Sequence, residues 1–259
     1  MTTREDLRRR GLEITERMGH GTNPPRPRPL SLRSIPGMHH FTTESIFGAV
    51  WARPGLDIRY RMLATLSVLT SLQRLAQLRA YINSALNLDI GAEEIQEVFI
   101  HCAIHSGFPT AVNSLELAKE IFDQRDLQPR LLEVPEVGLD ELEARGRKLR
   151  TELMGEDDAG GYVSAIDASI PDLRRLLLQY GLGEVFHRPG LDMKSRVVCT
   201  IASLTSLSAG PQLRNLLPAG VRVGFSRDEV LEILMQTAPY AGFPAAFNAV
   251  TIAAEVLPE

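Results

Sequence analysis

One stretch of the sequence occurs twice and decides the fold. It reads FGAVWARPGLD over residues 47–57 and LGEVFHRPGLD over residues 182–192, and the two copies lie 135 positions apart. The same offset relates GFP at residues 107–109 to GFP at residues 242–244. Solenoid repeats are only about 20–50 residues long. The much longer period therefore indicates a duplicated domain.

Each copy shows the spacing of apolar residues that is typical of helices. Leu63, Leu66 and Leu69 recur at every third position, and few segments alternate apolar and polar residues as strands do. We therefore expect an all-α protein of two tandem helical repeats, over residues 1–130 and 131–259. Because long apolar stripes need a partner surface, the repeats are expected to form an internal pseudo-dimer. The helices expected are 59–72, 75–86, 92–107 and 110–122 in the first repeat, and 193–207, 227–241 and 245–257 in the second.

The composition argues against several classes of partner. The net charge of −4 at pH 7 offers no electrostatic basis for binding nucleic acid or an anionic membrane. No apolar run approaches the roughly 20 residues that a transmembrane helix needs. No hydrophobic segment follows the N-terminus, so a cytoplasmic location is expected. The basic residues near that end, Arg4 and 8–10, are interpreted as a solvated helix face.

Several motifs, in the right order, resemble one known family. Residues 47–56 (FGAVWARPGL), 61–66 (RMLATL), 94–98 (EIQEV) and 235–246 (MQTAPYAGFPAA) are similar to carboxymuconolactone decarboxylases of the alkylhydroperoxidase-D-like superfamily. The resemblance covers nearly the whole chain. It implies an all-α homo-oligomer, as a dimer or trimer of pseudo-dimers, that acts on a small molecule without a cofactor.

Two features distinguish this chain from the pattern that it resembles. The CxxC pair of peroxidase-like relatives is absent and residues 74–77 (RLAQ) stand in its place, which argues against thiol-dependent peroxide reduction. The proton-handling histidine of the family corresponds to Tyr81 in the first repeat and Leu216 in the second. Pro211 and Pro218 should break the helix that presents Leu216. We therefore expect the second repeat to be degenerate and the first to carry the active pocket.

The most suggestive local cluster is formed by Glu97, His101 and His105, which lie four residues apart on one helix face. Histidine titrates near neutral pH and can shuttle protons, so we expect these three residues to be catalytic. Cys102 is adjacent and is expected in the substrate pocket. The alternative is that the histidines line an interface with satisfied hydrogen bonds. No HExxH motif occurs, and no metal site is expected.

An anion clamp would complete such a site. Arg61, which recurs as Arg196, could bind a carboxylate or enolate bidentately. The alternative is a salt bridge to a glutamate of the repeated set at positions 94, 97, 229 and 232. Tyr81 could donate a hydrogen bond to an oxyanion. The remaining residues expected to bind substrate are Arg74 in the family turn, Trp51 and Phe47 as apolar wall, and His39 as a group that closes the pocket.

These residues favour a cofactor-independent, decarboxylase-like enzyme that acts on a small carbonyl or lactone acid. The reaction would proceed through enolate stabilisation and proton transfer. Two alternatives stay open. One is a cyclase or isomerase that tailors a natural-product intermediate of the polyketide type, through the same enolate but without release of carbon dioxide. The other is a non-catalytic pseudoenzyme or ligand-binding scaffold, in which the histidines and Arg61 could change with no loss beyond stability.

Overall fold

The computed structural model describes residues 2–19, 35, 37–155, 166 and 168–258. In this part of the chain all regular structure is helical and no strand occurs, which confirms the all-α prediction. The first repeat contains α1 (Arg4–Arg17), α3 (Met38–His40), the π-helix η1 (Phe41–Trp51), α4 (Ile58–Ser71), α5 (Leu75–Asn87), α6 (Ala92–Ser106) and α7 (Phe108–Gln124). The second contains α8 (Leu139–Met154), α10 (Pro171–Leu176), the π-helix η2 (Leu177–Glu184), the short 3-10 helix η3 (Val185–His187), α11 (Met193–Ser206), α12 (Gly210–Arg222), α13 (Arg227–Ala241) and α14 (Phe243–Val256).

Both copies of the repeated RPGLD motif end at the N-cap of a long buried helix. The Asp57 carboxylate accepts a hydrogen bond from the N–H of Arg59 at the start of α4. Asp192 caps α11 in the same way through the N–H of Ser195. Such caps satisfy backbone donors that the first turn of a helix leaves unpaired. The motif therefore sets where the two central helices begin.

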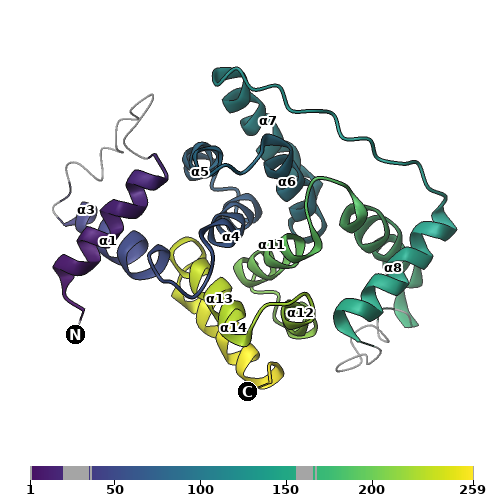
Figure 1. Cartoon of the computed structure of the whole chain (residues 1–259). Helices are drawn as coiled ribbons and strands as arrows, with labels where there is room; N and C mark the ends of the chain where they lie inside the picture. The colour runs from purple at the N-terminus through teal and green to yellow at the C-terminus, as the bar shows by residue number, and fades with distance from the viewer. Residues whose placement is uncertain (1, 20–34, 36, 156–165, 167, 259) are drawn as a thin grey trace.

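The two repeats pack on each other through these two helices. α4 and α11 lie side by side at the centre of the molecule (Figure 1), and most of their residues are buried. In addition, α13 of the second repeat packs on α4 of the first, and α6 of the first repeat packs on α11 of the second. The repeats are thus interlocked, as the predicted internal pseudo-dimer requires.

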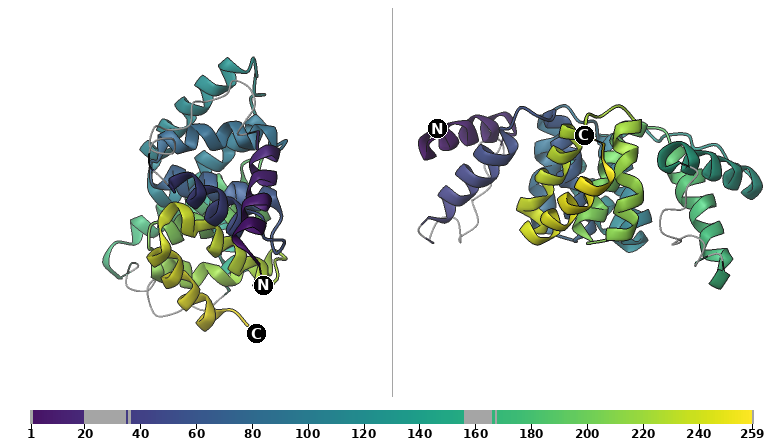
Figure 2. Two further views of the ribbon diagram at one scale, coloured as in Figure 1. Left: turned by 90° about the vertical axis from the view of Figure 1, so that its left-hand side faces the viewer. Right: turned by 90° about the horizontal axis from the view of Figure 1, so that it is seen from below.

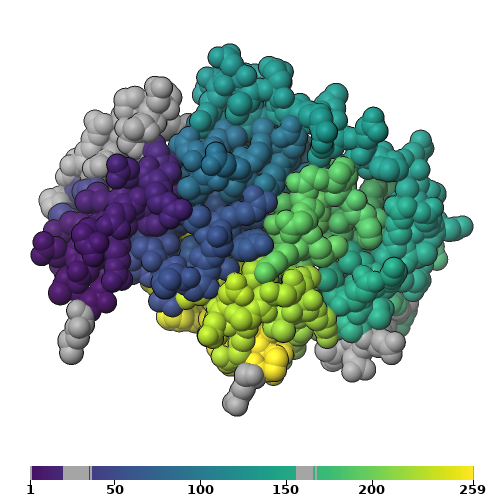
Figure 3. Space-filling view, viewed as in Figure 1, coloured from purple at the N-terminus to yellow at the C-terminus, as the bar shows by residue number. Residues whose placement is uncertain are grey.

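A pair of helices flanks this core at each end. α1 packs on η1 and α8 packs on η2, and the two pairs lie on opposite sides of the central helices (Figures 2 and 3). A Cβ atom at Gly11 would lie only 2.1 Å from the carbonyl oxygen of Thr43, and one at Gly146 only 2.0 Å from that of Leu178. Because no side chain fits there, glycine at these equivalent positions permits the close helix crossing in both repeats.

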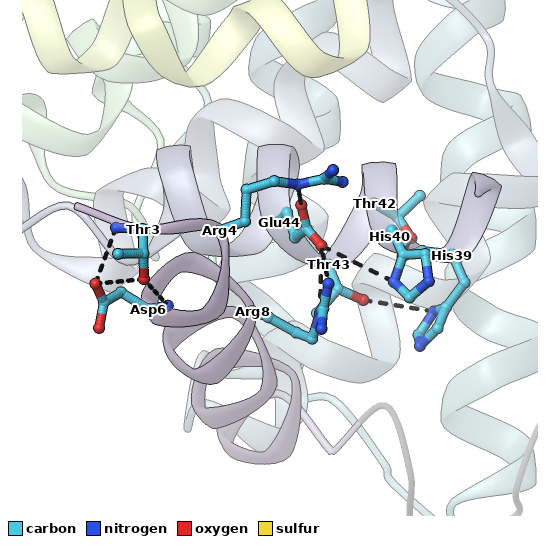
Figure 4. A network of polar contacts seen from close by, with 9 residues as sticks. All are labelled: Thr3, Arg4, Asp6, Arg8, His39, His40, Thr42, Thr43 and Glu44. Carbon is cyan, nitrogen blue, oxygen red and sulfur yellow. Dashed lines mark hydrogen bonds and ion pairs between the residues drawn. The ribbon is translucent and has the colours of Figure 1, made fainter. Parts of the chain in front are cut away.

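Ion pairs also join α1 to η1. Arg4 Nε lies 2.8 Å from Glu44 Oε2, and Arg8 Nη2 lies 2.6 Å from Glu44 Oε1 (Figure 4). Hydrogen bonds from Arg8 and Arg4 hold the pKa of the Glu44 carboxyl below its usual value. The N-terminal basic residues are therefore more than the solvated face that the sequence predicted, because two of them connect the helices of this pair.

The helix that carries Leu216 is continuous, so the prediction that prolines break it is wrong. Pro211 lies in the first turn of α12 and Pro218 lies inside the helix. A proline in the first turn removes no intrahelical hydrogen bond. Leu216 and Leu217, immediately before Pro218, are buried in the core. We attribute the tolerance of the internal proline to this packing.

Candidate functional site

Two clusters of side chains lie where the repeats interlock, and each cluster draws residues from both repeats. In each, one repeat supplies a fully buried arginine and the other supplies the glutamate that pairs with it. The aromatic cluster consists of Trp51, Arg53, Arg61, Thr65 and Tyr81 together with Glu232, Gln236 and Tyr240. The histidine cluster consists of Glu97, His101 and His105 together with Phe186, Arg188, Arg196 and Thr200.

An ionic triad forms the base of the aromatic cluster. Arg61 Nη2 lies 2.7 Å from Glu232 Oε2, and Arg53 Nε lies 2.7 Å from Glu232 Oε1. Arg61 also donates through Nη2 to the carbonyl oxygen of Arg53 at 3.0 Å and through Nη1 to Gln236 Oε1 at 3.3 Å. The alternative interpretation of Arg61, a salt bridge to a repeated glutamate, is therefore confirmed.

Three aromatic side chains of this cluster bond to one another. Trp51 Nε1 donates to the Tyr240 hydroxyl at 2.7 Å, and the hydroxyls of Tyr240 and Tyr81 are 2.6 Å apart. Burial, and then the neighbouring Tyr240, raise the pKa of Tyr81 well above its usual value; burial likewise raises the pKa of Tyr240. Both phenols therefore stay protonated at neutral pH and act as hydrogen-bonding groups.

The same ionic triad recurs in the histidine cluster. Arg188 Nη2 lies 2.7 Å from Glu97 Oε1, and Arg196 Nη2 lies 3.3 Å from Glu97 Oε2. Arg196 Nη2 also donates to the carbonyl oxygen of Arg188 at 2.7 Å, as Arg61 does to Arg53. The two clusters therefore share a frame and differ in what lies above it.

Two imidazoles take the place of the amide and the phenol. His101 Nε2 and His105 Nε2 lie 2.8 and 3.1 Å from the same atom, the hydroxyl oxygen of Thr200. His101 is fully buried, whereas His105 is half-buried. Burial lowers the pKa of His101 well below its usual value, helped by His105 and Arg196, and burial lowers the pKa of His105 to about 4. Both imidazoles are therefore neutral at pH 7.

His101 occupies the position equivalent to Gln236, and with histidine there some polar atoms of the cluster have no partner in the described part of the chain. Arg196 Nη1 and His101 Nδ1 are buried and have no hydrogen-bond partner among the described residues. In the aromatic cluster the equivalent Nη1 atom of Arg61 bonds to Gln236, and the Nε atom of Arg61 is the unpaired one. Buried polar groups are rarely left without a partner, so the histidine cluster has a donor and an acceptor available beside a half-buried imidazole.

The residues expected to form one catalytic pocket are thus divided. Arg61 and Tyr81 lie in the aromatic cluster, while Glu97, His101 and His105 lie in the histidine cluster. The expectation of a single pocket built mainly by the first repeat is wrong, because the face of α6 that carries the histidines packs on α11 of the second repeat.

The residues expected to bind substrate are also dispersed. Trp51 belongs to the aromatic cluster and Phe47 packs beside it, with ring centroids 6.4 Å apart. Arg74 is an exposed residue at the N-cap of α5. His39 lies near Thr43, with His39 Nδ1 and Thr43 Oγ1 3.4 Å apart (Figure 4).

Cys102 is adjacent to His101 in the sequence, but its thiol does not bond to either histidine of the cluster. Its side chain is fully buried and accepts a hydrogen bond from Ser203 Oγ at 3.5 Å. Burial raises the pKa of the thiol to about 11. Cys199 is also buried, and burial raises the pKa of its thiol. Both thiols are protonated at neutral pH and packed in the interface between the repeats.

Four site residues that were not predicted from the sequence could have been found from the repeat. Arg53 and Arg188 belong to the repeated RPGLD motif, Thr65 and Thr200 belong to the two central helices, and none of the four is among the predicted site residues. Each pair recurs at the offset of 135 positions. A polar residue kept in both copies beside a buried helix is the feature that could have identified them.

Neither cluster contributes to a surface groove that other described residues form. This groove of about 470 Å³ lies between α5 and α7. Arg79 and Glu120 form an ion pair at it. Its chemistry is that of an ordinary polar surface, so we assign the candidate site by the buried polar clusters instead. The groove is lined by Leu75, Ala76, Arg79, Asn113, Glu116, Leu117 and Glu120.

Two general properties bear on the site. Among the described residues, no three histidine, cysteine or acidic side chains are arranged to hold a metal ion. Over the same part of the chain, none of the helices is both long and apolar enough to traverse a bilayer.

The fold places this chain among all-α proteins built from two repeats, and the two repeats are joined by two equivalent arginine–glutamate triads. The profile of the carboxymuconolactone decarboxylase family matches residues 36–120 and again residues 171–255, so the chain belongs to this family. It is 31% identical to the 4-carboxymuconolactone decarboxylase of Acinetobacter baylyi over 90 residues, which are 35% of this chain and 67% of that protein.

Two further relatives match comparable or smaller shares of the chain. One is an uncharacterised 15.0 kDa protein of Paracoccus denitrificans, 32% identical over 37% of this chain and 72% of its own length. The other is a nitrosuccinic acid decarboxylase of Metarhizium robertsii, 33% identical over 28% of this chain and 51% of its own length.

Proposed function

We propose that this protein is a cofactor-independent lyase that removes carbon dioxide from a small carbonyl or lactone acid, and that the reaction takes place at the histidine cluster. One observation carries the choice of site: Arg196 has an unpaired, buried Nη1 donor in the same cluster as two neutral imidazoles. Family membership supports the class of reaction, as do two relatives whose names describe decarboxylases of organic acids.

The groups of this cluster suit the needs of such a reaction. The bond from carbon to the carboxylate breaks, its electron pair passes to the neighbouring carbonyl as an enolate, and carbon dioxide leaves. An arginine that donates to the developing oxyanion lowers the barrier. The enolate then takes one proton at carbon for each carbon dioxide lost. His105 is partly open to solvent and can take up this proton and pass it on.

The aromatic cluster suits the same reaction less well. Its phenols are protonated and bonded to Trp51 Nε1 or to each other, and, unlike the histidine cluster, it contains no neutral imidazole that could accept a proton. We therefore assign it a structural role, although it occupies the equivalent position in the pseudo-dimer.

A second function is favoured by the protonation state of the histidines. A neutral imidazole is a base, and a base beside an oxyanion donor can remove a proton next to a carbonyl. The same enolate would then lead to isomerisation or cyclisation without carbon dioxide release. The two functions therefore share a site and differ in their products.

Product analysis with matched variants tests the proposal. Small β-keto, nitro and lactone acids are mixed with excess protein in buffered D2O, and carbon dioxide and deuterium at carbon are both measured. We expect carbon dioxide from at least one acid, with a loss of about 100- to 10,000-fold in His105→Gln and less than about tenfold in Tyr240→Phe. Undiminished release in His105→Gln would contradict the assignment. Deuterium exchange without carbon dioxide would establish the second function instead.

A further inference from the structure

We infer that Thr200 is a positioning residue that holds both His101 and His105 as the tautomer protonated at Nε2, so that Nδ1 of each ring keeps its lone pair. The tautomers themselves follow from hydrogen bonding alone. Only their meaning for proton transfer rests on the proposed function.

The first step is the hydrogen-bond capacity of the threonine. A hydroxyl has one hydrogen to donate and two lone pairs that accept. Thr200 Oγ1 lies 3.0 Å from the carbonyl oxygen of Arg196, 2.8 Å from His101 Nε2 and 3.1 Å from His105 Nε2. The hydroxyl donates its hydrogen to the carbonyl oxygen of Arg196, which can only accept and which is also a hydrogen-bonding neighbour of His101. Both lone pairs are then left for the imidazoles, and each imidazole must donate through Nε2.

The aromatic cluster offers a parallel for this hydroxyl orientation, at Thr65. A guanidinium can only donate, so the side-chain oxygen of Gln236 faces Arg61 Nη1, at 3.3 Å. The amide nitrogen of Gln236 therefore faces Thr65 Oγ1, at 3.1 Å, and must donate to it. The Thr65 hydroxyl donates to the carbonyl oxygen of Arg61, at 2.9 Å, and the Tyr240 hydroxyl is a further hydrogen-bonding neighbour of Thr65. Thr200 occupies the equivalent position on α11 and meets the equivalent carbonyl oxygen.

The surroundings of His101 agree with this assignment. Its Nδ1 atom is buried without a hydrogen-bond partner among the described residues, and an N–H group is a costlier group to bury unpaired than a lone pair. The ring is held edge-on to Phe186, with centroids 4.6 Å apart. In the proposed reaction Thr200 would therefore determine that Nδ1, and not Nε2, is the atom that takes up the proton.

The test is an NMR measurement of the histidine tautomers in the full chain labelled with ¹⁵N-histidine. His101→Gln and His105→Gln assign the two rings. We expect both rings to show a protonated Nε2 and an unprotonated Nδ1 at pH 7. A protonated Nδ1 on either ring of the unmodified protein would overturn the inference, whatever the variants do.

Substitutions at Thr200 test whether this residue determines the tautomers of His101 and His105. Thr200→Val should lose the exclusive Nε2–H pattern on at least one ring, and Thr200→Ser should restore it. Thr65→Val, the matched change in the aromatic cluster, should leave the histidine tautomers unchanged. An unaltered pattern in a folded Thr200→Val protein would also overturn the inference. Because the readout needs no turnover, the tautomers can be established even if no acid is decarboxylated, and the proposed function can hold even if the tautomers differ.

Discussion

The histidine cluster and the aromatic cluster are two versions of one arrangement. Both pair two arginines with one glutamate across the repeats, and both contain a threonine that bonds to the carbonyl oxygen of the buried arginine. Above this frame the aromatic cluster closes on itself through Trp51, Tyr81 and Tyr240. The histidine cluster instead contains neutral imidazoles, and the Nδ1 atom of His101 is buried there without a hydrogen-bond partner among the described residues. The ionic frame between the repeats therefore recurs in both clusters, while the side chains next to it differ.

The largest effect should come from breaking the frame itself. Glu97→Gln leaves the buried charge of Arg196 without its counter-charge, and we expect it to lower the free energy of unfolding by about 3–5 kcal/mol. Glu232→Gln should cost less, because its partner Arg53 is 46% exposed whereas Arg188, the equivalent partner of Glu97, is 22% exposed. Urea unfolding measures both. A larger loss for Glu232→Gln would contradict the view that the histidine cluster is the more buried of the two.

A smaller effect is expected from opening the aromatic cluster. Tyr240→Phe removes the acceptor of the buried Trp51 Nε1 atom, which should cost about 1–3 kcal/mol of stability. Tyr180→Phe, at an exposed tyrosine, is the control and should change little. If Tyr240→Phe were as stable as the control, the closed aromatic network would not be a stabilising feature.

In the histidine cluster, introducing the glutamine found at the equivalent position of the aromatic cluster should raise stability. His101→Gln supplies an acceptor for Arg196 Nη1 and a donor for Thr200, as Gln236 does in the aromatic cluster. We expect the free energy of unfolding to rise by about 1 kcal/mol. A clear loss of stability in chemical denaturation would show that the unpaired atoms of the unmodified cluster are not a cost to folding.

A further effect, absent at neutral pH, is a difference in pH dependence. The pKa of His105 is about 4 in the folded protein and about 6.5 in the unfolded chain. Between these values the unfolded chain binds a proton that the folded protein does not, so His105 makes stability fall as the pH is lowered from about 6.5 to about 4. His105→Gln should reduce the slope over this range by up to about one proton. Tyr240→Phe, which removes no group that titrates there, should leave the slope unchanged.

Much of the fold could be predicted from the sequence because duplication doubles every signal. The repeat of residues 47–57, together with helical spacing, was sufficient for two all-α repeats. The stripe formed by Glu97, His101 and His105 was recognised as one helix face. Which surface that face meets could not be predicted, because periodicity shows that a face is buried but not which repeat covers it.

This gap explains the errors in the candidate site. Arg61 was grouped with the histidines of its own repeat, whereas its carboxylate partner, Glu232, comes from the other repeat. Arg53 and Thr65 were missed because turn and helix residues have ordinary structural explanations. That the protein forms a homo-oligomer, as a dimer or trimer of pseudo-dimers, stays a prediction.

Exchange of one cluster's residues for the other's tests the account most directly. The double variant His101→Gln with His105→Tyr rebuilds the pattern of Gln236 and Tyr240 on the histidine side. Carbon dioxide release is measured under single-turnover conditions with an acid that the unmodified chain decarboxylates. We predict a folded protein whose release falls to the uncatalysed rate; release that persists at the original rate would contradict the assignment of the histidine cluster as the reaction site.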